Sequence, residues 1–343
     1  KNCSGVCFGF VGGGCENNIC SVSVGNDCGA FIGGGVQNNI CDAHFAVIVG
    51  GVENCVKDLC SSIVGGCQNC ITRSNSFIGG GYQNEIVAGS SSVVGGVGND
   101  IDSSQAFIGG GSSNCIAGAS SANSTIGGGR ENCITGTCNV IGGGKANSIE
   151  SDVTCATIAG GFTNLVSAGK GAIGGGMNNK VGGSGTCGTI AGGLLNEVCE
   201  NAGTVGGGHF NIVKGDCATI AGGNCLSATG AMSFMGGGST NSTAASGSAV
   251  VAGVDNVILT NFKNCACSGC STIAGGQCNQ TSGAKATIGG GQCNCVCGES
   301  ATIAGGSGGV AGGPCTFIGG GSVNNISATA NAASIVGGLN HTI

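Results

Sequence analysis

A unit of about fifteen residues recurs along almost the whole chain and restricts it to a fold built from stacked repeats. Each copy centres on an apolar anchor residue followed by small residues; 21 anchors align, and 13 of the 20 intervals between them are 15 residues long. The anchors are Val11, Ile32, Ile48, Ile63, Ile78, Val93, Ile108, Ile126, Ile141, Ile158, Ile173, Ile190, Val205, Ile220, Met235, Val250, Ile273, Ile288, Ile303, Ile318 and Ile335. Positions are counted from the anchor as zero, so the third residue after it stands at +3.

Four columns of the alignment define the coil. Position +3 is Gly in all 21 copies, +2 is Gly in every copy but Ala252, +6 is Asn in 18 copies and +8 is Ile or Val in 17. Fifteen residues are too few for a helical hairpin, and no window shows helical periodicity. The period suits two short strands and two turns. We therefore expect an all-β fold, a parallel β-solenoid of about 21 coils, with strands at the anchor and at +6 to +8.

The small and amide residues have physical roles in such a coil. Gly-Gly permits a corner with positive φ and close approach of backbones. Asn tolerates a left-handed turn conformation, and its amide can also stack in a ladder from coil to coil. Alternation along the second strand places +6 and +8 inside and +5, +7 and +9 outside. At a strand spacing of roughly 4.8 Å, 21 coils predict a rod about 100 Å long.

The repeat runs along the chain, so we expect one continuous repeat domain, 1–343, with irregular insertions near 12–31 and 254–272.

Charge and motifs exclude several other classes of protein. The net charge of −6 argues against nucleic acid as a partner, and the lack of an 18-residue apolar stretch argues against membrane insertion. The segment "VIGGGKANS" (140–148) lacks the spacing of a phosphate-binding loop, so no cofactor is expected.

Large apolar residues recur at position −1, where the strand's alternation points them away from the anchor side. They are Phe31, Phe77, Phe107, Phe234 and Phe317. Repeated outward Phe on a slender fold predicts that this face meets another chain. We therefore expect self-association.

The repeat pattern, as in "STIGGG…NCITGTCNVIGGG" (124–144), resembles the head repeats of trimeric autotransporter adhesins. It is also similar to Gly/Asn-rich repeats of phage and large-virus fibre proteins. The resemblance covers essentially the whole chain from Val11 to Ile343. It implies a left-handed parallel β-roll, a homotrimer, exposure on a cell, virion or other extracellular surface, and a host-surface receptor or glycan as a partner. The chain departs from the adhesins in lacking a coiled-coil stalk and membrane-anchor strands. Its many cysteines favour a viral fibre or extracellular filament instead.

The two ends of the sequence also bear on assembly. Asn2 falls in the Asn column of an incomplete coil, and Ile343 completes a +8 strand. Solenoid ends normally carry a polar cap, so the pattern predicts either end-to-end stacking into a filament or a segment of a longer fibre.

The 26 cysteines gather in particular columns. Seven stand at −3, namely Cys60, Cys138, Cys155, Cys187, Cys217, Cys270 and Cys315; five stand at +7, namely Cys55, Cys70, Cys115, Cys133 and Cys295. Stacked pairs such as Cys55/Cys70 and Cys278/Cys293 would have Cα atoms within the disulfide range. Cys55/Cys60 and Cys133/Cys138 are candidates for bridging a turn within one coil. Structural disulfides are the favoured interpretation.

Metal binding is the second interpretation of the cysteines. The candidate ligands are Cys265, Cys267 and Cys270 with Cys278 nearby, and Cys293, Cys295 and Cys297 on one strand face. Thiolates on a rigid strand suit zinc or an iron–sulfur cluster, although paired C-x-x-C knuckles are absent.

Catalysis has little support in the sequence. His44, His209 and His341 are the only histidines, and nothing places one beside a particular cysteine as its base. The leading hypothesis is a non-enzymatic structural surface fibre or filament subunit, rigid, disulfide-reinforced and suited to attachment or assembly. The alternatives are a metal-binding solenoid and an ice-binding solenoid, the latter suggested by the Thr residues at −1 that Phe interrupts.

Overall fold

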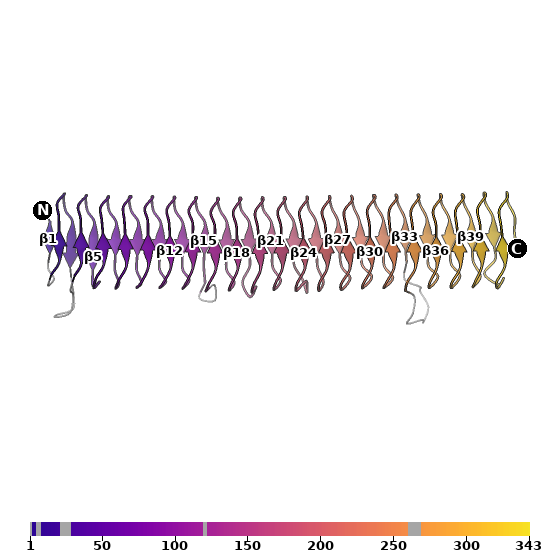
Figure 1. The fold of residues 1–343 in the computed structure, drawn as a ribbon, viewed down its shortest axis with the longest axis horizontal. Coiled ribbons are helices and arrows are strands. Elements are labelled where there is room, and N and C mark those ends of the chain that lie inside the picture. The colour runs from indigo at the N-terminus through magenta and orange to yellow at the C-terminus, as the bar shows by residue number, and fades with distance from the viewer. Residues whose placement is uncertain (1, 5–7, 21–28, 119–121, 260–268) are drawn as a thin grey trace. The chain divides into compact units, whose positions relative to one another are not determined.

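The computed structural model describes residues 2–4, 8–20, 29–118, 122–259 and 269–343 of the chain. Within these ranges every regular element is a short β-strand. The chain divides into two compact units, Lys1–Lys170 and Gly171–Ile343, and each is a stack of coils of about fifteen residues (Figure 1). The expected all-β parallel solenoid is confirmed.

Two strands belong to each coil. Even-numbered strands hold positions −1 and 0 and form what we call the anchor sheet of each unit; odd-numbered strands hold +7 and +8 and form the second sheet.

In the unit Lys1–Lys170 the anchor sheet consists of β2 (Phe10–Val11), β4 (Phe31–Ile32), β6 (Val47–Ile48), β8 (Ser62–Ile63), β10 (Phe77–Ile78), β12 (Ser92–Val93), β14 (Phe107–Ile108), β16 (Thr125–Ile126), β18 (Val140–Ile141) and β20 (Thr157–Ile158). Its second sheet consists of β1 (Cys3–Ser4), β3 (Asn18–Cys20), β5 (Asn39–Cys41), β7 (Cys55–Val56), β9 (Cys70–Ile71), β11 (Glu85–Ile86), β13 (Asp100–Ile101), β15 (Cys115–Ile116), β17 (Cys133–Ile134), β19 (Ser148–Ile149) and β21 (Leu165–Val166).

In the unit Gly171–Ile343 the anchor sheet consists of β22 (Ala172–Ile173), β24 (Thr189–Ile190), β26 (Thr204–Val205), β28 (Thr219–Ile220), β30 (Phe234–Met235), β32 (Ala249–Val250), β34 (Thr272–Ile273), β36 (Thr287–Ile288), β38 (Thr302–Ile303), β40 (Phe317–Ile318) and β42 (Ser334–Ile335). Its second sheet consists of β23 (Lys180–Val181), β25 (Glu197–Val198), β27 (Ile212–Val213), β29 (Ser227–Ala228), β31 (Ser242–Thr243), β33 (Val257–Ile258), β35 (Gln280–Thr281), β37 (Cys295–Val296), β39 (Val310–Ala311) and β41 (Asn325–Ile326).

Equivalent strands of successive coils pair in parallel with no shift of register. Phe77 lies opposite both Ser62 and Ser92 in the anchor sheet. A third line of pairing, which the sequence did not predict, runs through isolated bridges at +4, such as Cys67 opposite Tyr82. Each repeat column is therefore a physical row of neighbouring side chains in the unit that contains it.

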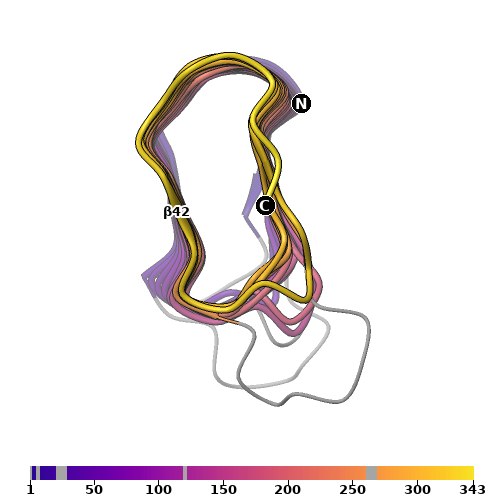
Figure 2. The same cartoon turned by 90° about the vertical axis from the view of Figure 1, so that its right-hand side faces the viewer.

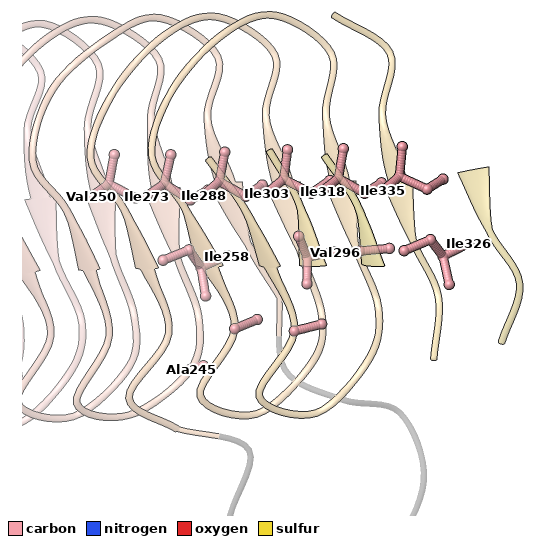
Figure 3. Close-up of a cluster of buried hydrophobic side chains, with 13 residues drawn as sticks. Ala245, Val250, Ile258, Ile273, Ile288, Val296, Ile303, Ile318, Ile326 and Ile335 are labelled. Carbon is pink, nitrogen blue, oxygen red and sulfur yellow. The ribbon is translucent and has the colours of Figure 1, made fainter. Parts of the chain in front are cut away.

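The core of a coil is one apolar residue thick on each side. Apart from Val11 and Ile343 in the end coils, the anchors and the +8 residues are almost fully buried and face one another across the coil, as Figure 3 shows for Ile288 and Ile303 opposite Val296. In the end-on view of Figure 2, the coil nearest the C-terminus has an elongated outline with β42 on one long side. Two apolar columns of Ile and Val suffice because the coil is too narrow to need larger side chains.

Buried asparagines at +6 form the expected ladder. The Asn84 amide Nδ2 donates to Asn69 Oδ1 at 3.1 Å, to Gly80 O at 3.0 Å and to Gly96 O at 3.0 Å. Its Oδ1 accepts from the Nδ2 and the backbone N–H of Asn99. One side chain thus satisfies the polar groups of three coils in the buried interior.

A second buried polar column, at −2, was not recognised from the sequence. The Ser61 hydroxyl donates to Arg73 O at 2.9 Å and accepts the backbone N–H of Ser76 at 3.2 Å. Ser91 repeats the pattern with Ser103 O and Ala106 N–H. Small Ser and Ala residues before the anchor therefore line the interior.

The left-handed residues differ in part from expectation. Glycine at +3 has positive φ in all 21 copies, as predicted for the corner. The Asn at +6 does not; positive φ falls on the residue before it, for example Gln68 (58°) and Cys278 (54°), and on the −3 residue, for example Cys60 (53°). The reason is that Asn must point inward to bond the ladder, so the outward-facing residues beside the strands make the turns.

Candidate functional site

The exposed side of the anchor sheet is the most uniform surface of each unit. It is formed by positions −1 and +1, which hold only Gly, Ala, Val, Ser, Thr and Phe in all 21 copies. The Phe residues at −1 other than Phe10 are 37–42% exposed, and the Val residues at +1 are 45% exposed or more. We call these residues the uncharged face. The outward orientation of Phe31, Phe77, Phe107, Phe234 and Phe317 that the sequence predicted is confirmed.

Side-chain sizes compensate one another across this face. Wherever Phe stands at −1, Gly stands at +1, as in Phe77/Gly79 and Phe234/Gly236. A Cβ added to either glycine would lie 2.3 Å from a backbone oxygen of the next coil and 3.5 Å, van der Waals contact, from the Phe ring's Cε1, so the ring packs beside a position that holds no side chain. Conversely, Ser92 precedes Val94. The compensation holds in every copy with Phe or Ser at −1, whereas Val47 stands with Val49 and Ala172 with Gly174.

Charged side chains lie elsewhere on the coil. In the second sheet, Lys180 pairs with Glu197 of the next coil at 3.1 Å. At +4 and +5, Arg130 pairs with Glu131 at 3.3 Å. Because hydration of charges opposes burial, the uncharged face is the surface of these units that costs least to cover.

Four of the cysteines singled out from the sequence lie as the stacking argument predicts. Cys55 and Cys70 are in-register neighbours on β7 and β9, half-buried on the outer side of the second sheet. Cys278 and Cys293 stack at +5, where their side chains are joined by a hydrogen bond. All four are free thiols in the structure.

The pairs proposed to bridge a turn within one coil, Cys55/Cys60 and Cys133/Cys138, are not bonded to each other in the structure. Cys55 contacts Cys70, and Cys133 contacts Cys115 on the neighbouring strand. Cys60 and Cys138 are free, exposed thiols that occupy the left-handed −3 position. The within-coil pairings stay predictions.

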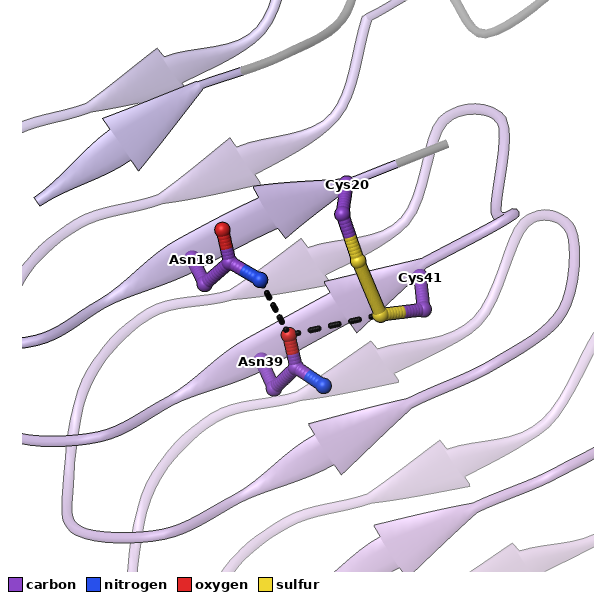
Figure 4. Close-up of a disulfide and its surroundings, with 4 residues drawn as sticks. All are labelled: Asn18, Cys20, Asn39 and Cys41. Carbon is purple, nitrogen blue, oxygen red and sulfur yellow. Dashed lines mark hydrogen bonds between the residues drawn. A yellow bond between two sulfur atoms is a disulfide. The ribbon is translucent and has the colours of Figure 1, made fainter. Parts of the chain in front are cut away.

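Two cross-coil pairs were missed by the sequence analysis. Cys20 and Cys41 form a disulfide between β3 and β5, with Cα atoms 4.8 Å apart (Figure 4). Cys115 and Cys133 are in-register neighbours on β15 and β17. Both pairs share a column, +9 and +7, so the stacking rule alone would have found them; the intervals of 21 and 18 residues hid the match.

The hydrogen bond within each cysteine pair at +7 gives its two thiols different pKa values. The bond with Cys70 lowers the pKa of Cys55 to about 7, against the effect of burial and with help from Lys57. The bond with Cys115 lowers the pKa of Cys133 to about 7, again against burial. The pKa values of Cys70 and Cys115 are raised by the same bonds and by burial.

The candidate metal ligands are only partly described. Cys265 and Cys267 lie outside the described residues, and Cys270 is an exposed free thiol. Cys295 on β37 and Cys297 just after it have their sulfur atoms 3.5 Å apart. Burial, and to a lesser extent the hydrogen bond with Cys297, raises the pKa of Cys295 to about 12. Among the described residues, no group of three or more Cys, His, Asp or Glu side chains is arranged to hold a metal ion.

Comparison with known proteins adds no family assignment. No protein-family model matches the chain, and no curated protein sequence matches it. In the described part of the chain, no helix is long and apolar enough to cross a bilayer.

Proposed function

We propose that the chain is a non-enzymatic structural subunit that associates with further copies of itself through the uncharged face to build an extracellular, cell-surface or virion-surface fibre or filament. Three chains are expected, in line with the adhesin-head repeats that the sequence resembles. A host receptor or glycan is the proposed target of the assembled surface.

The uncharged face is the observation that carries this proposal. Two positions in each of 21 coils lack charged, amide and imidazole side chains, whereas the columns at −3 and +4 include residues such as Lys170, Lys285, Arg130 and Lys145. An exposed strip without charges, in which Phe and Val stand among Thr, Ser, Gly and Ala, is less costly to cover than a charged surface and is typical of an interface. A second copy offers the same strip with the same spacing between coils.

Rigidity is the property the coil supplies to such a subunit. Backbone hydrogen bonds join each coil to the next at the anchor, at +4 and at +7, and the Asn ladder bonds the interior. Each coil contacts only its neighbours, so the unit extends by repetition and presents one surface many times. Repeated presentation favours multivalent attachment.

An oxidising environment is supported by the cysteines. The Cys20–Cys41 disulfide joins adjacent coils, and disulfides persist mainly outside the reducing cytosol. This supports the extracellular or virion-surface location proposed above.

A matched pair of substitutions tests the interface. Phe234→Lys puts a charge on the uncharged face, whereas Phe210→Lys puts the same charge on an equally exposed Phe at +5, away from that face. We expect Phe234→Lys to shift the mass measured by analytical ultracentrifugation towards that of a single chain, and Phe210→Lys to leave it unchanged. Equal behaviour of the two variants would argue against this face as the interface.

A further inference from the structure

The outer side of the second sheet carries an unusual run of reactive and charged groups in the unit Lys1–Lys170. Six neighbouring strands of the second sheet, the odd-numbered strands from β7 to β17, hold position +7 in register. The residues there are Cys55, Cys70, Glu85, Asp100, Cys115 and Cys133. Two thiol pairs thus flank two carboxylates.

Each thiol pair has the geometry that a disulfide requires. Cys115 lies directly opposite Cys133, and Cys55 opposite Cys70. In-register neighbours on parallel strands have Cα atoms roughly 4.8 Å apart, inside the disulfide range. The Cys20–Cys41 disulfide joins the second sheet in the same relation. All four thiols are half-buried, so small molecules in solution can reach them.

We propose that Cys115/Cys133 and Cys55/Cys70 are thiol–disulfide exchange sites, at which a small soluble disulfide is reduced and a reversible covalent bond closes between adjacent coils of one chain. This goes beyond the proposed self-association and does not rest on it.

The hydrogen bond within each pair sets the order of attack, and the two central carboxylates reinforce it. Asp100 stands beside Cys115 and Glu85 beside Cys70, and each negative charge disfavours a thiolate on its neighbour. The outer cysteine of each pair, Cys133 or Cys55, therefore holds the thiolate and attacks first.

Acidic groups near the outer cysteines are engaged by partners. Gln68 donates to Glu53, two residues before Cys55, at 2.6 Å. Arg130 pairs with Glu131, two residues before Cys133. Arg130 partly offsets the charge of Glu131, and the amide of Gln68 stabilises the Glu53 carboxylate by a hydrogen bond.

The exchange balances without any further reagent. The Cys133 thiolate attacks one sulfur of the small disulfide; the disulfide bond breaks, and one half leaves as a thiolate that takes a proton from water. Cys115 then loses its proton to water and attacks Cys133 Sγ in the mixed disulfide, releasing the second half. Two protein thiols are oxidised and one small disulfide is reduced to two thiols.

The Cys115/Cys133 site is the sharper test because trypsin separates its two cysteines. Peptide 74–130 contains Cys115 alone, and peptide 131–145 contains Cys133 and Cys138. The full chain is equilibrated with glutathione disulfide, quenched in acid, alkylated, digested and analysed by mass spectrometry. We expect the two peptides to be joined through Cys133, and the joined species to disappear after treatment with dithiothreitol.

Three single variants assign the roles. Cys138→Ser should retain the cross-link, whereas Cys133→Ser should abolish it. Cys115→Ser should trap glutathione on Cys133, about tenfold faster at pH 7 than Cys133→Ser traps it on Cys115, because the outer thiol is the more ionised. Circular dichroism of each variant verifies that the fold is intact.

Three results would overturn the inference. These are a disulfide closed within peptide 131–145 while Cys115 stays free, a cross-link found only between chains on non-reducing gels, or persistent glutathionylation of wild-type Cys133. The solitary thiol Cys225, whose column neighbours are Phe210 and Thr240, serves as the reference for ordinary glutathionylation.

Discussion

At the scale of single residues, the two glycines after the anchor differ in what they contribute. At +3, Gly291 has a φ of 89°, and an added Cβ would lie 2.1 Å from Gly306 O of the next coil. At +2, Gly290 would meet no atom within 4 Å. The presence of Ala252 at +2 in one copy agrees with this difference. Only the +3 glycine is required by the close approach of backbones.

Gly291→Ala and Gly290→Ala therefore form a matched pair. We expect Gly291→Ala to destabilise its coil by about 2–4 kcal/mol, from the left-handed φ and the contact with the next coil, and Gly290→Ala to change stability by under about 0.5 kcal/mol. Chemical denaturation midpoints of the two variants compare them directly. Similar midpoints would mean that the turn does not depend on the +3 position.

The sequence identified the +3 glycine from its invariance but assigned the left-handed conformation to the wrong polar residue. Asn has the strongest preference for that conformation among residues with a side chain, so the expectation followed propensity. The structure places Asn84 inside, with five hydrogen bonds, and gives the turn to Gln83. Tertiary hydrogen bonding outweighed local preference.

At the scale of the element, the Asn ladder unites the coils of each unit. Because every member both donates and accepts, removing its amide leaves carbonyl groups above and below without donors. Leu226 stands in the same column, which shows that an apolar side chain fits there, whereas a carboxylate would face three acceptor oxygens.

Asn84→Asp should therefore be more destabilising than Asn84→Leu. We expect a loss of about 3 kcal/mol or more for the carboxylate at pH 7 and a smaller loss for Leu. Burial should raise the pKa of the new carboxyl in the folded state, so the penalty should shrink as pH falls towards about 4 and grow as pH rises. Thermal melts of both variants at pH 4 and pH 7 measure this, and a penalty for Asp independent of pH would contradict the ladder's role.

The element level was the most predictable from sequence. A period of 15 with fixed Gly, Asn and Ile columns determined the strands, their parallel pairing and the inward side of each column. The −2 polar column escaped notice because Ser, Ala, Thr, Gly and one Asn share it, and no single residue type marks it. The Cys115/Cys133 pair could have been predicted, because both residues stand at +7 of successive coils; the 18-residue interval between them hid the match, and the structure places them in register.

At the scale of the whole molecule, the central claim is that copies of the chain associate through the uncharged face. No individual residue on that face would have revealed it. The signal is the joint absence of charge from two columns, together with the compensation of Phe by Gly and of Ser by Val.

Native mass spectrometry of the intact chain, with and without reductant, tests this claim most directly. The account predicts an oligomer, with three chains as the expected number, that persists after reduction because apolar contacts rather than disulfides join the copies. A single-chain mass under both conditions would contradict the proposed self-association and leave the uncharged face without its partner.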